Sequence, residues 1–250
     1  MMPELPIAAQ LYTVRDQMAH DFEGTLRAVT GLGYDGVEFA GLYNRPAEVV
    51  RALLDELGLR VSSAHVPLNL LEQELDETLA TYRTLGCPII VVPWLEVSRR
   101  NDYAALVPLL LSIAERVHAA GMRLAYHNHD FELAGPTGAT GLDTLKNATT
   151  AEQLQFELDC GWVYKAGQPV VEMIESLAGR LPLLHIKDVD GQGNWIEAGR
   201  GKVGYEQVVA LAPAAGVEWL ITELDVCPRP PLESLDLSLQ WLRAQHSIKN

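Results

Sequence analysis

The sequence predicts a single (β/α)₈ barrel, or TIM barrel, that occupies residues 1–250. The chain has 250 residues, which is the usual length of such a barrel. Short segments rich in Val, Ile and Leu alternate eight times with amphipathic segments, which indicates βαβ units and a parallel sheet. No Pro/Gly/Ser-rich linker divides the chain. The turn after the first strand carries neither GxGxxG nor GxxxxGK[ST], which disfavours an open nucleotide-binding sheet.

Eight segments are predicted to be strands. Most of them follow a Gly or Pro breaker, and their nearly continuous apolar runs suit parallel strands buried on both faces. The predicted strands are residues 7–12, 36–40, 60–66, 88–94, 123–129, 154–159, 181–188 and 219–225.

Helical periodicity fills the gaps between these strands. Several amphipathic segments end on glycine, as helices commonly do. Pro108 lies inside segment 101–121 and predicts a later start or a kink there. Segment 135–149 predicts a loop with about two helical turns. The other predicted helices are residues 21–33, 46–58, 69–86, 168–179, 205–216 and 234–245.

Composition limits the classes of partner. The hydrophobic fraction of 48% supports a large core, yet no apolar run approaches the roughly 20 residues that span a bilayer. The N-terminal MMPELPIAAQ lacks the features of a signal peptide. A net charge of −14 repels a phosphate polymer, so neither nucleic acid nor a membrane is an expected partner. A homo-oligomer is compatible with the sequence, which does not set the number of subunits.

The three cysteines, Cys87, Cys160 and Cys227, are widely spaced and form no CxxC pair. Reduced thiols and a cytoplasmic location are therefore expected. Cys160 follows Asp159 directly, which would suit a nucleophile, but a small packing residue at a strand end is the favoured interpretation.

Polar residues follow the ends of four successive predicted strands: Glu132, Asp159, His185 and Glu223. In a parallel barrel these ends meet on one face, where barrel enzymes keep their active sites. Carboxylates and an imidazole that meet at one point predict a divalent-metal site, since the like charges would otherwise repel one another.

The metal and its fourth ligand depend on the fifth strand region. Two carboxylates and one imidazole suit Mn²⁺, Mg²⁺, Co²⁺ or Zn²⁺ with open coordination positions. Glu132 is the preferred fourth ligand, because a further carboxylate suits a hard cation. His127 or His129 in its place would favour Zn²⁺.

The chain resembles the xylose isomerase-like TIM-barrel superfamily of sugar and sugar-phosphate isomerases and epimerases. The resemblance extends over nearly the whole chain, from QLYTVRD to TELD. Its motifs are GYDGVEFAG, SSAHVPL, YHNHDFE, ELDCGWV, HIKDVD and GRGKVGY.

The resemblance implies a metal held by Glu, Asp, His and Glu from the last four strands. Asp159, His185 and Glu223 match the last three positions. The first departs from the family, since Tyr126 stands where epimerases often carry glutamate, and Glu132 is the nearest carboxylate. A two-glutamate epimerisation mechanism is therefore not carried over, whereas the metal site is.

The implied activity is that of a sugar isomerase or epimerase in carbohydrate metabolism, acting on a keto sugar or polyol through a metal-stabilised enediolate. Glu223 or Glu132 is the expected base. Glu38, His65, His127, His129 and Lys187 are expected to contact the substrate, and Trp94 and Trp162 to cover its ring.

Three other functions compete with this one. A lyase or dehydratase that acts on an inosose or a 3-keto-glycoside would use the same enediolate. A carbohydrate-binding barrel would keep the pocket without turnover. An apurinic-site endonuclease shares the fold, but the net charge of −14 disfavours it.

Overall fold

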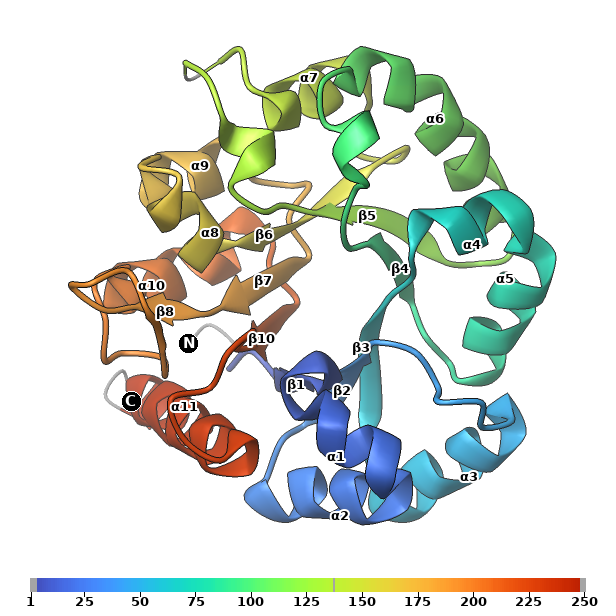
Figure 1. Cartoon of the computed structure of the whole chain (residues 1–250), viewed down its shortest axis with the longest axis vertical. Helices are drawn as coiled ribbons and strands as arrows, with labels where there is room; N and C mark the ends of the chain where they lie inside the picture. Colours follow the sequence, from blue (N-terminus) through green and yellow to red (C-terminus); the bar gives the residue numbers. More distant parts are fainter. Residues whose placement is uncertain (1–3, 137, 248–250) are drawn as a thin grey trace.

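The computed structural model describes residues 4–136 and 138–247. Eight parallel strands close into a barrel in the order β1-β10-β7-β6-β5-β4-β3-β2, and helices surround it (Figure 1). The predicted (β/α)₈ barrel is confirmed. The eight predicted strands are all present, as β1 Ile7–Gln10, β2 Gly36–Phe39, β3 Arg60–His65, β4 Ile89–Val92, β5 Arg123–His127, β6 Gln155–Asp159, β7 Leu183–Ile186 and β10 Trp219–Thr222.

Helices cover the outer face of this barrel. Three of them end as predicted on a glycine in the left-handed conformation, Gly33 (φ 99°), Gly58 (φ 67°) and Gly216 (φ 89°). None of the helices in the described part of the chain has the combined length and apolar character of a membrane-spanning segment. The helices are α1 Arg15–His20, α2 Phe22–Leu32, α3 Ala47–Leu57, α4 Leu68–Gln73, α5 Leu75–Thr84, α6 Tyr103–Ala119, α7 Gly141–Ala148, α8 Cys160–Lys165, α9 Val170–Ser176, α10 Tyr205–Ala215 and α11 Pro231–Ser247, with 3₁₀ turns η1 Leu11–Val14, η2 Val97–Arg99 and η3 Phe131–Leu133.

One predicted helix differs from the structure. The helix expected over residues 69–86 is divided into α4 and α5, because Glu74 leaves the helical conformation with φ −133° and ψ 34°. Pro108 lies inside α6, which starts at Tyr103 after Asp102 caps it by accepting a hydrogen bond from the Ala105 amide.

The sequence did not predict α8 or the antiparallel hairpin of β8 (Asp188–Val189) and β9 (Trp195–Ile196). Helix α8 begins directly after β6, and the Asp159 carboxylate caps it by accepting the Trp162 amide at 2.9 Å. Gly161 makes this approach to the end of β7 possible, since a Cβ there would lie 2.2 Å from the Lys187 carbonyl oxygen. Asp159 therefore both ends β6 and caps α8, and these two roles fix the position of its carboxylate.

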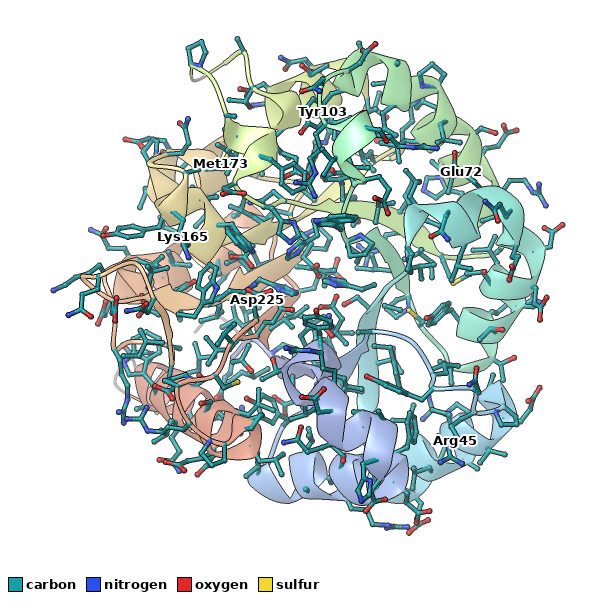
Figure 2. All side chains as sticks on the ribbon, in the orientation of Figure 1. Arg45, Glu72, Tyr103, Lys165, Met173 and Asp225 are labelled. Carbon is teal, nitrogen blue, oxygen red and sulfur yellow. The ribbon has the colours of Figure 1, made fainter. Side chains whose placement is uncertain are left out.

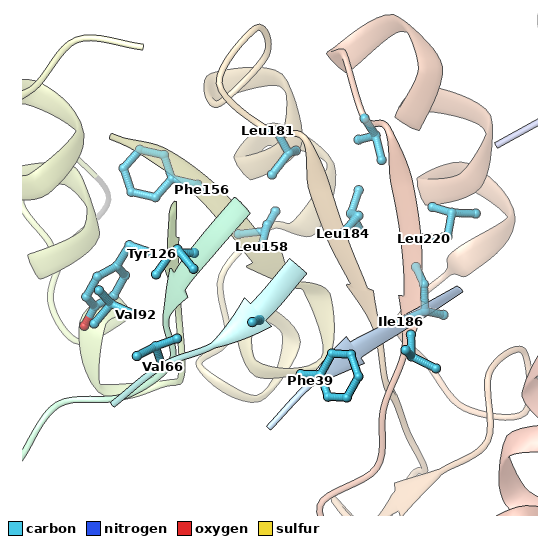
Figure 3. Packing of buried hydrophobic residues seen from close by; sticks show 14 of the residues in the cluster. Phe39, Val66, Val92, Tyr126, Phe156, Leu158, Leu181, Leu184, Ile186 and Leu220 are labelled. Carbon is cyan, nitrogen blue, oxygen red and sulfur yellow. The ribbon is translucent and has the colours of Figure 1, made fainter. Parts of the chain in front are cut away.

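Strand side chains alternate between the barrel interior and the layer under the helices. On β6 and β7, Phe156, Leu158, Leu184 and Ile186 belong to the larger apolar cluster (Figure 3). A separate apolar cluster consists of Ala8, Ile89, Val91, Ala125, Leu183, Trp219 and Ile221. These residues alternate along the strands with those of the larger cluster, so they fill the interior of the barrel. The polar side chains occupy the C-terminal end of this interior.

Candidate metal centre and substrate pocket

Strand β6 carries two acidic residues that point the same way. Glu157 and Asp159 are two positions apart, so both face the interior, and neither is exposed. The strand register pairs Glu157 with His127 on β5 and Asp159 with His185 on β7. Three neighbouring strands therefore place carboxylates beside imidazoles inside the barrel.

Four side chains form an outer donor group, defined here as His127, Asp159, His185 and Glu223, whose ligand atoms all lie within 4.8 Å of one another. His185 Nδ1 is 3.1 Å from Glu223 Oε2 and 3.9 Å from Asp159 Oδ2, and His127 Nε2 is 3.9 Å from Asp159 Oδ2. Ligands that share a metal at roughly 2.0–2.2 Å are typically separated by such distances. Two nitrogens and two oxygens fit a divalent transition metal.

A buried lysine lies against the outer donor group. Lys187 Nζ is 3.0 Å from Asp159 Oδ2, 2.7 Å from Glu223 Oε2 and 2.7 Å from Asp225 Oδ2. Burial opposes its charge, but the three carboxylates outweigh that effect and raise the pKa of Lys187 well above its usual value. One ammonium facing three carboxylates leaves negative charge unbalanced, and this excess favours a dication.

Charge at His185 and Glu223 is coupled. Burial opposes ionisation of Glu223, but Lys187 and His185 lower its pKa well below the usual value. Burial also opposes charge on His185, but Glu157 and Glu38 raise its pKa well above the usual value. A cation that binds at His185 Nδ1 must therefore displace a proton, so metal affinity should increase with pH.

A second layer of carboxylates lies deeper in the barrel. Glu157 Oε2 is 2.5 Å from His65 Nε2 and 2.9 Å from His127 Nδ1. Glu38 Oε2 is 2.7 Å from His185 Nε2. His65, His127, Glu157 and His185, the inner donor group, are also close enough together to hold an ion.

A pocket of about 530 Å³ opens onto these groups. Tyr12 and Trp94, which are 43% and 41% exposed, are aromatic residues of its lining. Asp225 also lines it and lies near the centre of the barrel in Figure 2. The full lining is Tyr12, Ala40, Gly41, His65, Pro67, Leu70, Tyr82, Pro93, Trp94, His127, His129, Glu223 and Asp225, and it includes no lysine or arginine among the described residues.

Residues 26–245 match the family model described as the xylose isomerase-like TIM barrel. The chain belongs to this family.

Relatives within this family have differing names. An inosose dehydratase from Geobacillus kaustophilus (strain HTA426) is 25% identical over 191 residues, which are 66% of this chain and 61% of that enzyme. A rhizopine catabolism protein, MocC, from Rhizobium meliloti is 23% identical over 248 residues, which cover 82% of this chain and 75% of that protein. This chain therefore matches about three fifths of the length of the Geobacillus relative.

Solved structures share the same xylose isomerase-like fold. A sugar phosphate isomerase/epimerase from Parabacteroides distasonis superimposes with a TM-score of 0.81 and 23% identity, covering 97% of this chain and 94% of that one. A D-allulose 3-epimerase from Methylomonas sp. has a TM-score of 0.75 and 15% identity, covering 98% and 99%. At these identities the likeness establishes the architecture alone.

Most of the predicted site residues of this xylose isomerase-like barrel come together. The outer donor group contains three predicted metal ligands, Asp159, His185 and Glu223. The predicted substrate contacts Trp94 and His129 line the pocket, whereas Trp162 does not and packs against His129 with ring centroids 5.2 Å apart. The remaining predicted contacts, Glu38, His65, His127 and Lys187, lie in or beside the two donor groups.

Glu132, the predicted fourth ligand, lies outside both donor groups. Tyr126 points outward into the larger apolar cluster, and its hydroxyl donates to Glu132 Oε1 at 2.6 Å. The His129 amide donates to Glu132 Oε2 at 2.8 Å. Both oxygens of Glu132 are therefore engaged in other hydrogen bonds, and in the outer donor group the side chain beside Asp159 is that of His127.

The sequence analysis missed Glu157. Only residues at the ends of the predicted strands were chosen as candidates, so Asp159 was chosen. Glu157, two positions earlier on the same strand, must face the same side. The two-residue period of a strand also places Ser63 and His65 on the same side of β3. The Ser63 hydroxyl donates to Glu38 Oε1 at 2.6 Å.

The three cysteines of this chain are free thiols. Cys160 is fully buried, and burial raises the pKa of its thiol well above the usual value. A thiol that stays protonated is a poor nucleophile, so the packing role predicted for Cys160 is favoured.

Glu132 should make stability depend on pH. Burial raises its pKa to about 7, above the value it has when unfolded. The folded chain thus binds the proton more tightly, and the free energy of unfolding should fall by about 3 kcal/mol as pH rises from 4.5 to above 7. Glu132→Gln should remove this loss, because its amide can donate to Tyr126 and accept from His129. Urea unfolding at pH 5 and pH 8 checks it; equal pH dependence in both proteins contradicts it.

Proposed function

We propose that this protein is a divalent-metal-dependent enzyme that abstracts a proton beside the carbonyl of a neutral keto sugar, as a sugar isomerase or epimerase does. The observation that carries the proposal is the outer donor group at the base of a pocket of about 530 Å³. Two nitrogens and two oxygens fit a divalent ion and leave coordination positions for substrate oxygens.

A bound divalent ion would supply Lewis-acid stabilisation of the enediolate charge that develops on the substrate oxygens. Proton transfer falls to the side chains. Glu223 lines the pocket and stays ionised because Lys187 and His185 lower its pKa, so it can accept the proton. Burial opposes charge on His65, but Glu38 and Glu157 raise its pKa, so it holds a proton that it can return to the substrate.

The pocket chemistry favours a substrate without phosphate. Its lining carries two carboxylates, Glu223 and Asp225, and no lysine or arginine among the described residues. A phosphate group would be repelled there and would find no bidentate arginine. Tyr12 and Trp94 instead offer faces on which the apolar side of a sugar or cyclitol ring can stack. Net charge of −14 likewise favours this small ligand over nucleic acid.

Trp94→Ala is expected to raise KM for a keto sugar roughly fivefold and to leave kcat nearly unchanged, because stacking contributes about 1 kcal/mol to binding. The Arg100 guanidinium lies 4.6 Å from the Trp94 ring centroid and holds the ring in place. Trp94→Phe is the matched control and should retain most of the affinity. Initial-rate kinetics measure both variants; an unchanged KM in Trp94→Ala argues against stacking at this position.

A dehydratase is the second candidate, because a relative that aligns with 66% of this chain is named inosose dehydratase. Elimination begins with the same proton abstraction and then expels a neighbouring hydroxyl as water. The Lys187 ammonium, 2.7 Å from both Glu223 Oε2 and Asp225 Oδ2, would hold these two pocket carboxylates in place during that step. Both candidates share the first step and differ in the product.

Solvent exchange tests the proposed function. The Mn²⁺-loaded protein in D₂O should incorporate deuterium next to the carbonyl of at least one ketose or inosose in a panel, measured by ¹H NMR. Phosphorylated counterparts should exchange far more slowly. A new sugar identifies an isomerase or epimerase, and an enol with one water fewer, or its keto tautomer, identifies a dehydratase. Sugar binding without exchange indicates a carbohydrate-binding barrel and contradicts the enzyme proposal.

A further inference from the structure

Each imidazole of the outer donor group has its two nitrogens facing different carboxylates. His127 directs Nε2 toward Asp159 Oδ2 at 3.9 Å and Nδ1 toward Glu157 Oε2 at 2.9 Å. His185 directs Nδ1 toward Glu223 Oε2 at 3.1 Å and Nε2 toward Glu38 Oε2 at 2.7 Å. In both rings, one nitrogen faces the outer donors and the other faces an inner carboxylate.

This arrangement decides where each proton sits when a cation is bound. A neutral imidazole has one N–H and one lone pair, and a carboxylate facing a ring nitrogen selects the N–H for that side. We propose that Glu157 and Glu38 are positioning residues that fix opposite tautomers of the two histidines. His127 then offers Nε2 to the cation, and His185 offers Nδ1.

The two inner carboxylates are themselves held in place. Glu38 accepts hydrogen bonds from Gln10 Nε2 and Ser63 Oγ, both at 2.6 Å. Glu157 Oε2 also lies 2.5 Å from His65 Nε2. Neither glutamate is exposed to solvent, so each keeps a fixed acceptor toward its histidine. Ordered acceptors of this kind hold the ring of a metal ligand in one orientation.

The same geometry excludes a second ion at the inner donor group. An ion there would need lone pairs on His127 Nδ1 and His185 Nε2, the nitrogens assigned here to N–H groups. The inner group is thus a hydrogen-bonded support, and the chain binds one ion. This inference rests on the proposed metal function, and the test separates the two.

Long-range ¹H–¹⁵N NMR of the Zn²⁺-loaded protein tests the inference without measuring activity. We expect one zinc ion per chain, an Nδ1–H tautomer for His127 and an Nε2–H tautomer for His185. Two ions per chain, or either tautomer reversed, would overturn the inference and leave the proposed metal function intact. Absence of zinc binding would overturn both.

Conservative variants give a second measurement. Glu157→Gln and Glu38→Gln should each weaken zinc binding by roughly 10- to 100-fold, the usual effect of losing such a partner. Glu157→Gln should also alter the His127 ¹⁵N shifts more than those of His185, and Glu38→Gln the reverse. Glu197→Gln is the matched control, since this buried glutamate pairs with Arg229 and Ser234. Unchanged affinity and ring shifts in both variants would contradict the positioning role.

Discussion

Alanine at Asp159 or His185 is expected to abolish tight binding of Mn²⁺ and Zn²⁺. Each residue supplies one of the four donors of the outer donor group. Losing a direct ligand should cost more than the roughly 10- to 100-fold in affinity that loss of a supporting residue costs. Isothermal titration calorimetry on the purified variants measures this loss.

Stability must be separated from metal binding in these variants. Asp159→Ala also removes the cap of α8, since Asp159 accepts the Trp162 amide, and this should cost about 1 kcal/mol. Asp159→Asn keeps the capping oxygen and should still lose the metal. His118→Ala, on the exposed face of α6, controls for removal of an imidazole. A folded Asp159→Asn or His185→Ala protein with unchanged affinity would contradict the ligand assignment.

His127→Ala is expected to lose tight metal binding, whereas Glu132→Gln should keep it. His127 lies in the outer donor group, and burial lowers its pKa to about 3, so its nitrogens are free of excess proton at neutral pH. Glu132 is engaged by Tyr126 and the His129 amide. The pair therefore distinguishes a two-nitrogen, two-oxygen site from the three-carboxylate site that the sequence predicted.

The comparison should use both a hard and a borderline metal. A site with two imidazoles should bind Zn²⁺ much more tightly than Mg²⁺. A site with three carboxylates should show a smaller difference between these two affinities. Competition titration with a chromophoric chelator gives both constants. If Glu132→Gln loses the metal and His127→Ala retains it, Glu132 is the ligand and the assignment from the structure is incorrect.

The strands of this barrel were predictable because each is a short apolar run bounded by breakers. β4, Ile89–Val92, is buried on both faces and reads as a continuous apolar segment. The division of the 69–86 helix was not predictable, because Leu68, Leu71 and Leu79 maintain an apolar stripe across Glu74. Periodicity records which face is buried but not a change in backbone direction.

The candidate site was predictable for residues at strand ends. It was not predictable where the orientation of a strand decides which side chains face the interior. Asp159, His185 and Glu223 could be selected because parallel strands bring their ends together. His127 and Tyr126 are neighbours in sequence, yet one faces the interior and the other the helices. A shift of one residue on β5 exchanges these roles, and the sequence alone does not fix it.

A crystal structure of the Mn²⁺-loaded protein, with an anomalous difference map at the manganese edge, tests the central claim most directly. We expect one peak, bonded to His127 Nε2, Asp159, His185 Nδ1 and Glu223 at roughly 2.0–2.3 Å. A peak among His65, Glu157 and the inner nitrogens, a peak at Glu132, or no peak in the barrel would contradict it.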